Sequence, residues 1–208
     1  MQGEIGDCYF LSAVSCIAVY PELIQRIFRD REVQATGCYS IVLCVQGCWE
    51  EIILDDLFPC YGNKLAFASS NSQGIWPMLI EKAWAKANGS YDSIISGQCS
   101  EAFRAVTGAC TSEYKIEDDN PEELFKIIYD SIRNNYLICC SSDSDLRSQI
   151  LNHGLVSNHA YSILDIEILI VKDGKYIRSP KGLQETRPAA RLIKIRNPWS
   201  RGEWKGKW

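Results

Sequence analysis

Histidine and excess positive charge are both scarce in this sequence. Its 208 residues include two His, and 22 Lys and Arg stand against 26 Asp and Glu, which gives a formal net charge of −4. Proteins that bind nucleic acids or anionic membranes usually present clustered Lys and Arg, and the charges here are spread along the chain. We therefore expect no nucleic-acid partner.

The sequence also lacks an apolar run long enough to cross a bilayer. The longest run spans residues 10–20, whereas a transmembrane helix needs about 20 predominantly apolar residues. Glu4 and Asp7 precede this run, in place of the positive charges that open a secretory signal. We therefore predict no transmembrane segment and a cytoplasmic location, in which the ten cysteines stay reduced.

Cysteine pairs at the C-x2-C spacing of many zinc sites are absent. Structural zinc sites are built from two close pairs of Cys or His ligands in loops. No C-x2-C pair occurs, and the C-x3-C pair Cys44 and Cys48 begins inside the apolar run YSIVLCV, which is typical of a strand. We therefore predict no metal site from the cysteines.

What is present is enough apolar material for a substantial core, since 46% of the residues are hydrophobic. Apolar periodicity predicts an α+β fold of two domains, a helical one over 1–108 and a β-rich one over 109–208. A cleft between two such domains is a common place for an active site. We predict helices over 8–20, 21–28, 76–87 and 121–134, a further helix that stops near 107–108, and strands over 38–45, 49–54, 136–140, 160–169, 176–177 and 190–195, with a hairpin turn at Asp173-Gly174.

Cys8 lies at the predicted start of the first helix. It follows Gly6-Asp7, and Asp is a favourable N-cap residue. The free backbone N–H groups of a first helical turn favour an anion, so a thiol placed there can become a reactive thiolate with a lowered pKa. A cysteine in an apolar helix more often fills a core. The interpretation of Cys8 as a nucleophile therefore depends on partners elsewhere in the chain.

Two histidines are available as the base that a nucleophilic cysteine needs. His153 lies in a loop-like stretch, whereas His159 immediately precedes the alternating pattern AYSILDI of a predicted strand. Because an imidazole at a strand end is held firmly, we favour His159. Asn197 follows the last predicted strand and precedes Pro198-Trp199, so its amide is a candidate to orient the imidazole and Trp199 is a candidate to shield that contact from water.

Three segments that contain these residues resemble the active-site segments of the calpain family of papain-like cysteine proteases. They read QGEIGDCYFLSAV, NHAYSIL and KIRNPWSRGEWKGKW. The segments LDDLFP, WPMLIEKAWAKANGSY, SGQ and FRAVTG also follow the family's order, so the resemblance runs from Gln2 to Trp208. It implies a papain-like cysteine protease fold, with the active site between a helical first lobe and a β-rich second lobe.

The resemblance also implies a role for each residue at a matching position. Cys8 is then the nucleophile, His159 the base, Asn197 the residue that orients His159, and Gln2 a donor to the oxyanion. Trp199 matches the tryptophan beside the family's triad. The implied function is an intracellular endopeptidase that carries out limited proteolysis of protein substrates, with regulatory domains outside this chain.

The sequence departs from the family's usual pattern at the substrate cleft. Asn158 stands where the family typically has Gly, and Gln98 replaces the second Gly of a segment in which Gly97 is retained. We expect Trp199, Asn158, Gln98 and Gly97 to line the substrate site, and the two larger side chains to narrow it.

Calcium is implied by the resemblance, but few of its ligands are in place. Typical calpain cores bind Ca²⁺ in each lobe, and Ca²⁺ takes about six to eight oxygen ligands. The family's acidic position before the EKAWAK helix falls near Gly74, and Glu203 is the one matching carboxylate. We therefore expect weak or absent Ca²⁺ binding by residues 1–108, and no organic cofactor.

Two other functions stay open at this point. A catalytically quiet calpain-like module that binds protein partners would keep the fold without hydrolysis, and the altered cleft residues favour it. A related acyl-transfer enzyme, such as a transglutaminase, would use Cys and His similarly. Fast, His159-dependent labelling of Cys8 separates a protease from the quiet module, and cleaved or cross-linked products separate it from the transferase.

Overall fold

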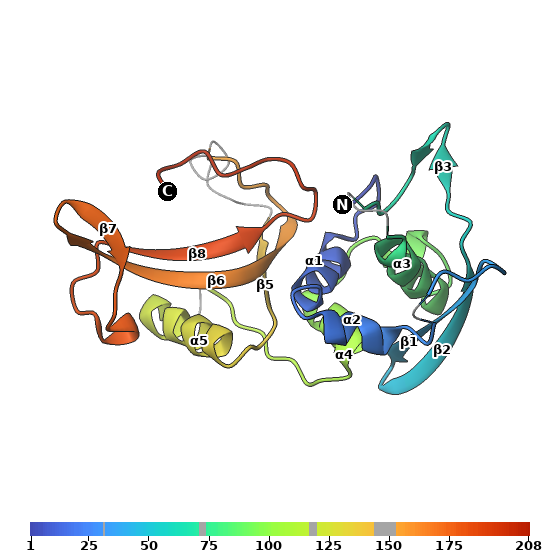
Figure 1. Ribbon diagram of the computed structural model, residues 1–208, viewed down its shortest axis with the longest axis horizontal. Helices are drawn as coiled ribbons and strands as arrows, with labels where there is room; N and C mark the ends of the chain where they lie inside the picture. The colour runs from blue at the N-terminus through green and yellow to red at the C-terminus, as the bar shows by residue number, and fades with distance from the viewer. Residues whose placement is uncertain (31, 71–73, 117–119, 144–152) are drawn as a thin grey trace.

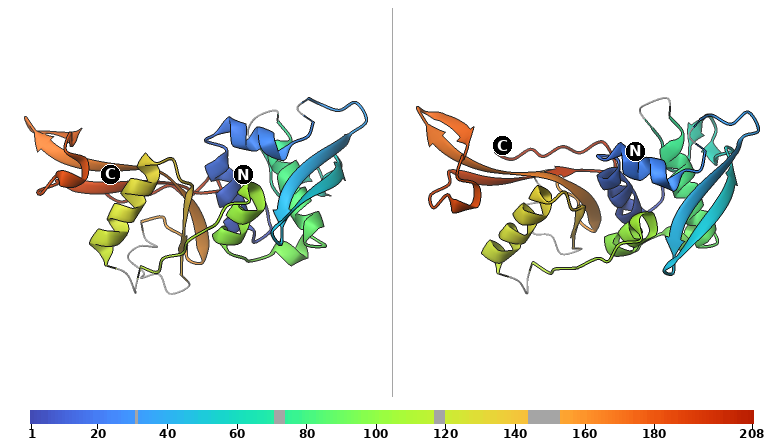
Figure 2. Two further views of the ribbon diagram at one scale, coloured as in Figure 1. Left: turned by 90° about the horizontal axis from the view of Figure 1, so that it is seen from below. Right: turned by 60° about the horizontal axis from the view of Figure 1, so that its bottom comes forward.

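The computed structural model describes residues 1–30, 32–70, 74–116, 120–143 and 153–208, and its helices and strands confirm the predicted α+β class. Helices and a long hairpin gather on one side of the molecule, and a twisted sheet with a helix lies on the other side (Figure 1). Figure 2 shows these two parts next to each other from two further directions. The domain boundary after Gly108 stays a prediction. Gly108 itself ends the last helix of the first part in a left-handed conformation, with a φ of 69°.

The first part of the chain is built around α1, Cys8–Ile17. All residues from Tyr9 to Val14 are buried, as are Cys16 and Ile17, so other elements cover this helix on every side, as predicted. The surrounding elements are α2 (Pro21–Ile27), the antiparallel hairpin of β1 (Cys38–Val45) and β2 (Cys48–Asp55), the short pair β3 (Cys60–Tyr61) and β4 (Lys64–Leu65), α3 (Trp76–Ala87), the 3-10 turn η1 (Asp92–Ile94) and α4 (Cys99–Thr107).

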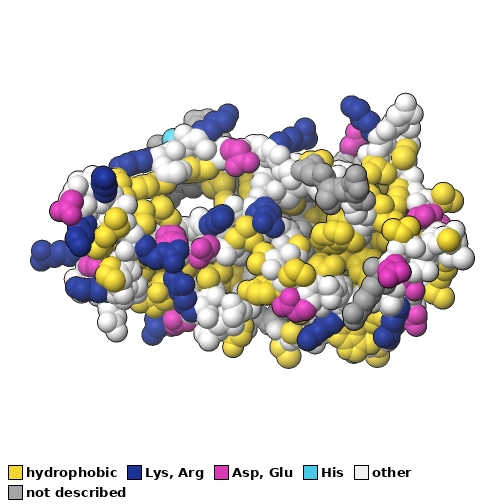
Figure 3. Space-filling model, in the orientation of Figure 1, with side chains coloured by type: hydrophobic (Ala, Val, Ile, Leu, Met, Phe, Trp, Pro, Cys, Tyr) yellow, Lys and Arg dark blue, Asp and Glu magenta, His cyan; other side chains and the backbone are white. Residues whose placement is uncertain are grey.

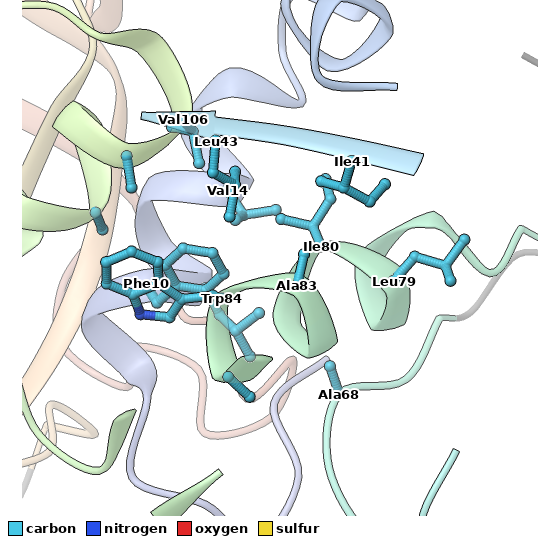
Figure 4. Close-up of a cluster of buried hydrophobic side chains, with 14 of the residues drawn as sticks. Phe10, Val14, Ile41, Leu43, Ala68, Leu79, Ile80, Ala83, Trp84 and Val106 are labelled. Atoms are coloured by element: carbon cyan, nitrogen blue, oxygen red, sulfur yellow. The ribbon is translucent and has the colours of Figure 1, made fainter. Parts of the chain in front are cut away.

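The hydrophobic core of this part fixes α1 against its neighbours. Phe10 has no exposed surface and stacks on Trp84 of α3, with ring centroids 5.2 Å apart and planes 4° from parallel. Ile41 of β1 and Val106 of α4 belong to the same cluster (Figure 4). Burial of one such side chain contributes about 1.5–3 kcal/mol. The start of α1, where Cys8 lies, therefore rests on a firmly packed base.

The second part of the chain is a sheet organised around one long strand, β6. All pairings with β6 are antiparallel: β5 pairs with its beginning, β7 pairs with its end, and β8 runs along the opposite edge. One helix, α5, lies against a face of this sheet (Figure 2). The elements are α5 (Pro121–Arg133), β5 (Ile138–Ser142), β6 (His159–Lys172), β7 (Lys175–Arg178), the 3-10 turn η2 (Gly182–Gln184) and β8 (Ala190–Arg196).

Antiparallel pairing brings two distant polar residues to the same end of this sheet. Ser162 of β6 pairs with Arg196 of β8. His159 is the first residue of β6, and Asn197 follows the last residue of β8. The register therefore places His159 and Asn197 next to each other.

The same end of the sheet packs against α1. The hydroxyl of Ser162 donates a buried hydrogen bond of 2.9 Å to the carbonyl oxygen of Ser12. The sulfur atoms of Cys16 in α1 and Cys139 in β5 lie 3.7 Å apart. These contacts fix the helix that begins at Cys8 relative to the strand that begins at His159.

The differences from the predicted elements have local causes. The helix predicted over 8–20 ends at Ile17, because the chain turns there and α2 begins at Pro21. The short strands β3 and β4 were not predicted, since two-residue strands carry no periodic signal. The predicted hairpin turn is confirmed: Asp173 and Gly174 have φ values of 51° and 73°, as tight antiparallel turns require.

The surface and the helix lengths bear on the predicted partners. On the face seen in Figure 3, Lys and Arg side chains are interspersed with Asp and Glu rather than joined in one basic stripe. Within the described ranges, no single helix is long and apolar enough to cross a membrane, although α1 and α2, bent by 117° at their junction, pass that test as a pair.

Candidate active site

The structure places Cys8 at the first position of α1, beside the start of β6. Asp7 occupies the N-cap position, and its carbonyl oxygen accepts the first helical hydrogen bonds from Phe10 and Leu11, at 2.9 and 3.1 Å. The thiol is partly buried, and the backbone N–H of Ala160 is directed at its sulfur. Ala160 follows His159 in β6, so the Cys8 sulfur contacts the residue next to the predicted base.

The electrostatic setting of Cys8 differs from the expectation of a lowered pKa. Burial raises the pKa of the Cys8 thiol, and the hydrogen bond from the backbone of Ala160 offsets this only in part. The expectation was wrong for this structure because it counted the helix terminus and not the removal of the thiol from water. The thiol is thus neutral at neutral pH unless a base takes its proton.

His159 and Asn197 form the contact that the sequence predicted. The imidazole Nε2 lies 2.8 Å from Asn197 Oδ1. An amide oxygen only accepts hydrogen bonds, so Nε2 is the protonated nitrogen and Nδ1 is left free to accept a proton. Asn197 is held in this orientation at both ends: its Oδ1 also accepts from the Trp199 backbone N–H at 3.0 Å, and its Nδ2 donates to the Arg201 carbonyl oxygen at 3.0 Å.

Aromatic rings enclose the imidazole of His159. The Trp199 ring lies over it with centroids 4.3 Å apart, and Tyr161 meets it edge-on at 4.9 Å. Only 3% of His159 is exposed. This burial lowers the pKa of His159, and the bond to Asn197 raises it in part. The imidazole is therefore neutral in this structure and is shielded from water by Trp199, as predicted.

Gln2 lies next to the loop that carries Asn197, because its backbone bonds to that loop. The Gln2 N–H donates to the Pro198 carbonyl oxygen at 2.9 Å, and the side-chain Nε2 donates to the Ile5 carbonyl oxygen at 2.6 Å. An amide nitrogen has two hydrogens, so one remains to point at a substrate oxyanion. The oxyanion role of Gln2 stays a prediction.

Besides Trp199, three residues were expected at the substrate cleft, and they have distinct structural settings. A Cβ on Gly97 would lie 2.6 Å from the Tyr9 ring, so the Gly97 backbone packs directly on the residue after Cys8. Gln98 is exposed and is the N-cap residue of α4. Asn158 is exposed and has a φ of 51°, a left-handed conformation that Asn tolerates well and that explains Gly as its usual counterpart. Substrate contacts by these residues stay predictions.

Ser142, which the sequence did not indicate, fixes the backbone of His159. The Ser142 hydroxyl accepts from the His159 backbone N–H at 3.1 Å and donates to the Val156 carbonyl oxygen at 2.6 Å. A serine at a strand end carries no pattern that would identify this role. His153, the alternative base, is exposed and packs against Trp204 at 5.3 Å rather than at this site.

Metal ligands do not gather within the described ranges. No three His, Cys, Asp or Glu side chains there come close enough to hold a metal ion. Glu203, the carboxylate that matches a calcium position in the resemblance, is exposed. This donor set does not fit the six to eight oxygens that Ca²⁺ takes.

Comparison with known proteins places this site in a family context. A family model described as calpain family cysteine protease matches residues 1–208. The whole chain is similar to the calpain-1 catalytic subunit of Rattus norvegicus (33% identity over 214 residues), the calpain-2 catalytic subunit of Gallus gallus (31% over 214 residues) and calpain-13 of Rattus norvegicus (29% over 213 residues). The chain spans 28%, 28% and 30% of the length of these relatives.

Proposed function

Because the chain belongs to the calpain family of cysteine proteases, we propose that it hydrolyses peptide bonds in proteins, with Cys8 as nucleophile and His159 as base. The observation that carries this proposal is the bond from His159 Nε2 to Asn197 Oδ1 at 2.8 Å. It leaves Nδ1 as the nitrogen that accepts the thiol proton. The sulfur that donates this proton lies beside Ala160, the next residue of the same strand.

The first half of the reaction forms a thioester. His159 Nδ1 takes the proton of Cys8, and the sulfur attacks the carbonyl carbon of the scissile peptide bond. Negative charge that develops on the carbonyl oxygen is stabilised by the Cys8 backbone N–H and the free amide hydrogen of Gln2. The imidazolium then gives its proton to the leaving amine as the C–N bond breaks.

The second half restores the enzyme. A water molecule gives a proton to His159 and attacks the thioester carbonyl, and the thiolate leaves and regains the proton from the imidazolium. Asn197 keeps the ring in place through both halves, and Trp199 keeps bulk water from competing for the bond between them. The product is a cleaved polypeptide, in keeping with limited proteolysis.

The redox state of the cysteines indicates the compartment in which the protein acts. All ten cysteines are free thiols, including the close pair Cys16 and Cys139. Free thiols persist in reducing compartments, so we propose that the protein acts in the cytoplasm.

One observation favours the alternative of a catalytically quiet binding module. The pKa of Cys8 is raised and the pKa of His159 is lowered, and both directions favour the neutral thiol and imidazole over a thiolate–imidazolium pair. An active protease must overcome this preference when substrate binds. A quiet module never does.

Cleavage of an unfolded protein such as casein tests the proposal, with and without added Ca²⁺. The wild-type chain should produce new amino termini, Cys8→Ala should produce none, and Cys38→Ala, which removes an exposed thiol, should match the wild type. Cross-linked products would instead indicate acyl transfer. Residual cleavage by Cys8→Ala at the wild-type rate would contradict the assignment of the nucleophile.

A further inference from the structure

Two buried carboxyl groups that the proposed mechanism does not use meet next to Cys8. Asp7 precedes Cys8 and has no exposed surface, and Glu81 of α3 is 1% exposed. In the part of the chain that the structure describes, neither Asp7 oxygen accepts a hydrogen bond, although Asp7 occupies the N-cap position. The group that faces it is the Glu81 carboxyl. Two adjacent buried carboxylates cannot both be ionised without a large cost in free energy.

The contacts of the two groups decide which one carries the proton. Both oxygens of Glu81 accept from the backbone N–H of Ala68, at 2.9 and 3.1 Å, and such bonds favour an ionised carboxylate. Among the described residues, no backbone N–H bonds to the Asp7 carboxyl in this way. Burial and the neighbouring Glu81 together raise the pKa of Asp7 well above its ordinary value. Burial raises the pKa of Glu81 as well, but its hydrogen bonds to Asp7 and to the Ala68 N–H act against this, so the contacts favour the proton on Asp7 and the negative charge on Glu81.

Other titratable groups near the pair do not change this assignment. Burial raises the pKa of the Tyr9 and Tyr91 phenols, and the nearby carboxyls raise it further, so both phenols stay neutral. Within the described ranges, the α-amino group of Met1 brings a positive charge near the pair, but burial lowers its pKa, and it donates to the Ser69 carbonyl oxygen.

The pair also connects the segments that carry the proposed nucleophile and oxyanion donor. Asp7 begins α1 through its carbonyl oxygen. Glu81 holds Ala68, and the segment around Ala68 pairs with the chain that includes Gln2, since the Glu4 N–H donates to the Ala66 carbonyl oxygen at 3.0 Å. A change in the charge of the pair thus acts on both sides of the site.

We propose that Asp7 and Glu81 share one proton, carried by Asp7, and act as positioning residues that give the Cys8 thiol a neutral neighbour. The catalytic consequence rests on the proposed function. A negative charge on Asp7 would raise the pKa of Cys8 and so oppose formation of the thiolate.

Infrared spectroscopy of the full chain tests the shared proton directly. At neutral pH, where exposed carboxyls are ionised, the wild type should show a protonated carboxyl C=O band. Asp7→Asn should remove this band, and Glu4→Gln, which removes an exposed carboxylate nearby, should keep it. A wild-type spectrum without the band overturns the proposal, whether or not the variants fold.

The pH profile of Cys8 alkylation by iodoacetamide tests the effect on the nucleophile. Below the pH at which the Asp7 band disappears, Cys8 should react at equal rates in the wild type and in Asp7→Asn. Above that pH, the wild type should be slower by about tenfold, because the negative charge on Asp7 raises the pKa of Cys8 by about one unit. Glu81→Gln removes the neighbouring charge and should shift the loss of the band to lower pH. If the alkylation profiles of the wild type and Asp7→Asn coincide over the pH range in which the Asp7 band is lost, the positioning role is overturned.

These readouts do not require proteolysis. A chain that cleaves no protein but shows the band and the divergent alkylation profiles keeps the proton pair and refutes the proposed function. A chain that cleaves protein but lacks the band keeps the proposed function and refutes the proton pair.

Discussion

The bond between His159 and Asn197 supports a quantitative prediction for Asn197→Ala. The substitution removes the acceptor that lies 2.8 Å from Nε2 and that also accepts from the Trp199 backbone N–H. A hydrogen bond to a charged group contributes about 1.5–3 kcal/mol, and His159 is charged when it protonates the leaving amine. At about 1.4 kcal/mol for each factor of ten, kcat/KM should fall about 10- to 150-fold.

The same substitution should move the titration of His159. The bond to Asn197 raises the pKa of the imidazole against the effect of burial, so its loss should lower that pKa further. Asn197→Asp is the matched control, because it keeps an oxygen acceptor and adds a negative charge that raises the pKa. NMR titration of the two imidazoles can follow this, with His153→Gln assigning the signals.

The outcome that would refute this reasoning is equally specific. If Asn197→Ala keeps both the kcat/KM and the His159 pKa of the wild type, Asn197 does not orient the base. Thermal unfolding of each variant checks that the fold is retained, since Asn197 also bonds to the backbone of Trp199 and Arg201.

Three further predictions follow from the described contacts. Phe10→Ala should lower the free energy of unfolding by about 3–5 kcal/mol, because it empties a fully buried site stacked on Trp84; urea unfolding measures this, Val33→Ala at a site 88% exposed is the control, and equal losses would contradict the packing argument. His159 has a folded pKa below its ordinary value of 6.5, so its contribution to stability is present above that pH and is lost as the pH falls through the lower folded pKa; His159→Gln should flatten this part of the profile of stability against pH. Calorimetric titration with Ca²⁺ should show no tight stoichiometric site in residues 1–108, and a stoichiometric isotherm that is abolished by substitution of a carboxylate in that range would overturn this.

The sequence predicted best what local signals determine. Pro21 opens α2, Asn120 caps α5 by accepting from the Glu122 N–H at 3.0 Å, and Asp173-Gly174 forms the predicted turn. The pairing of His159 with Asn197 was also predictable, because each lies at the end of a predicted strand and the resemblance supplied their relation. Family membership then followed from ordered motifs over the whole chain.

The remainder depends on contacts between distant segments. The raised pKa of Cys8 comes from burial against the sheet, and the helix terminus alone predicted the opposite direction. Asp7 looked like an ordinary capping residue, and nothing in its neighbourhood along the chain indicated that Glu81 would face it. Gly97 was expected to matter for substrate, whereas its close contact with the Tyr9 ring became visible only in three dimensions.

Competitive labelling of the cysteines tests the central claim most directly. A thiol-directed peptide electrophile, followed by mass spectrometry, reports the rate at each cysteine of the wild type and of His159→Ala. The account predicts that partly buried Cys8 reacts far faster than the exposed Cys38, Cys48, Cys60 and Cys110, and that His159→Ala removes this advantage. Labelling of Cys8 no faster than these exposed thiols, and unchanged by His159→Ala, would contradict it.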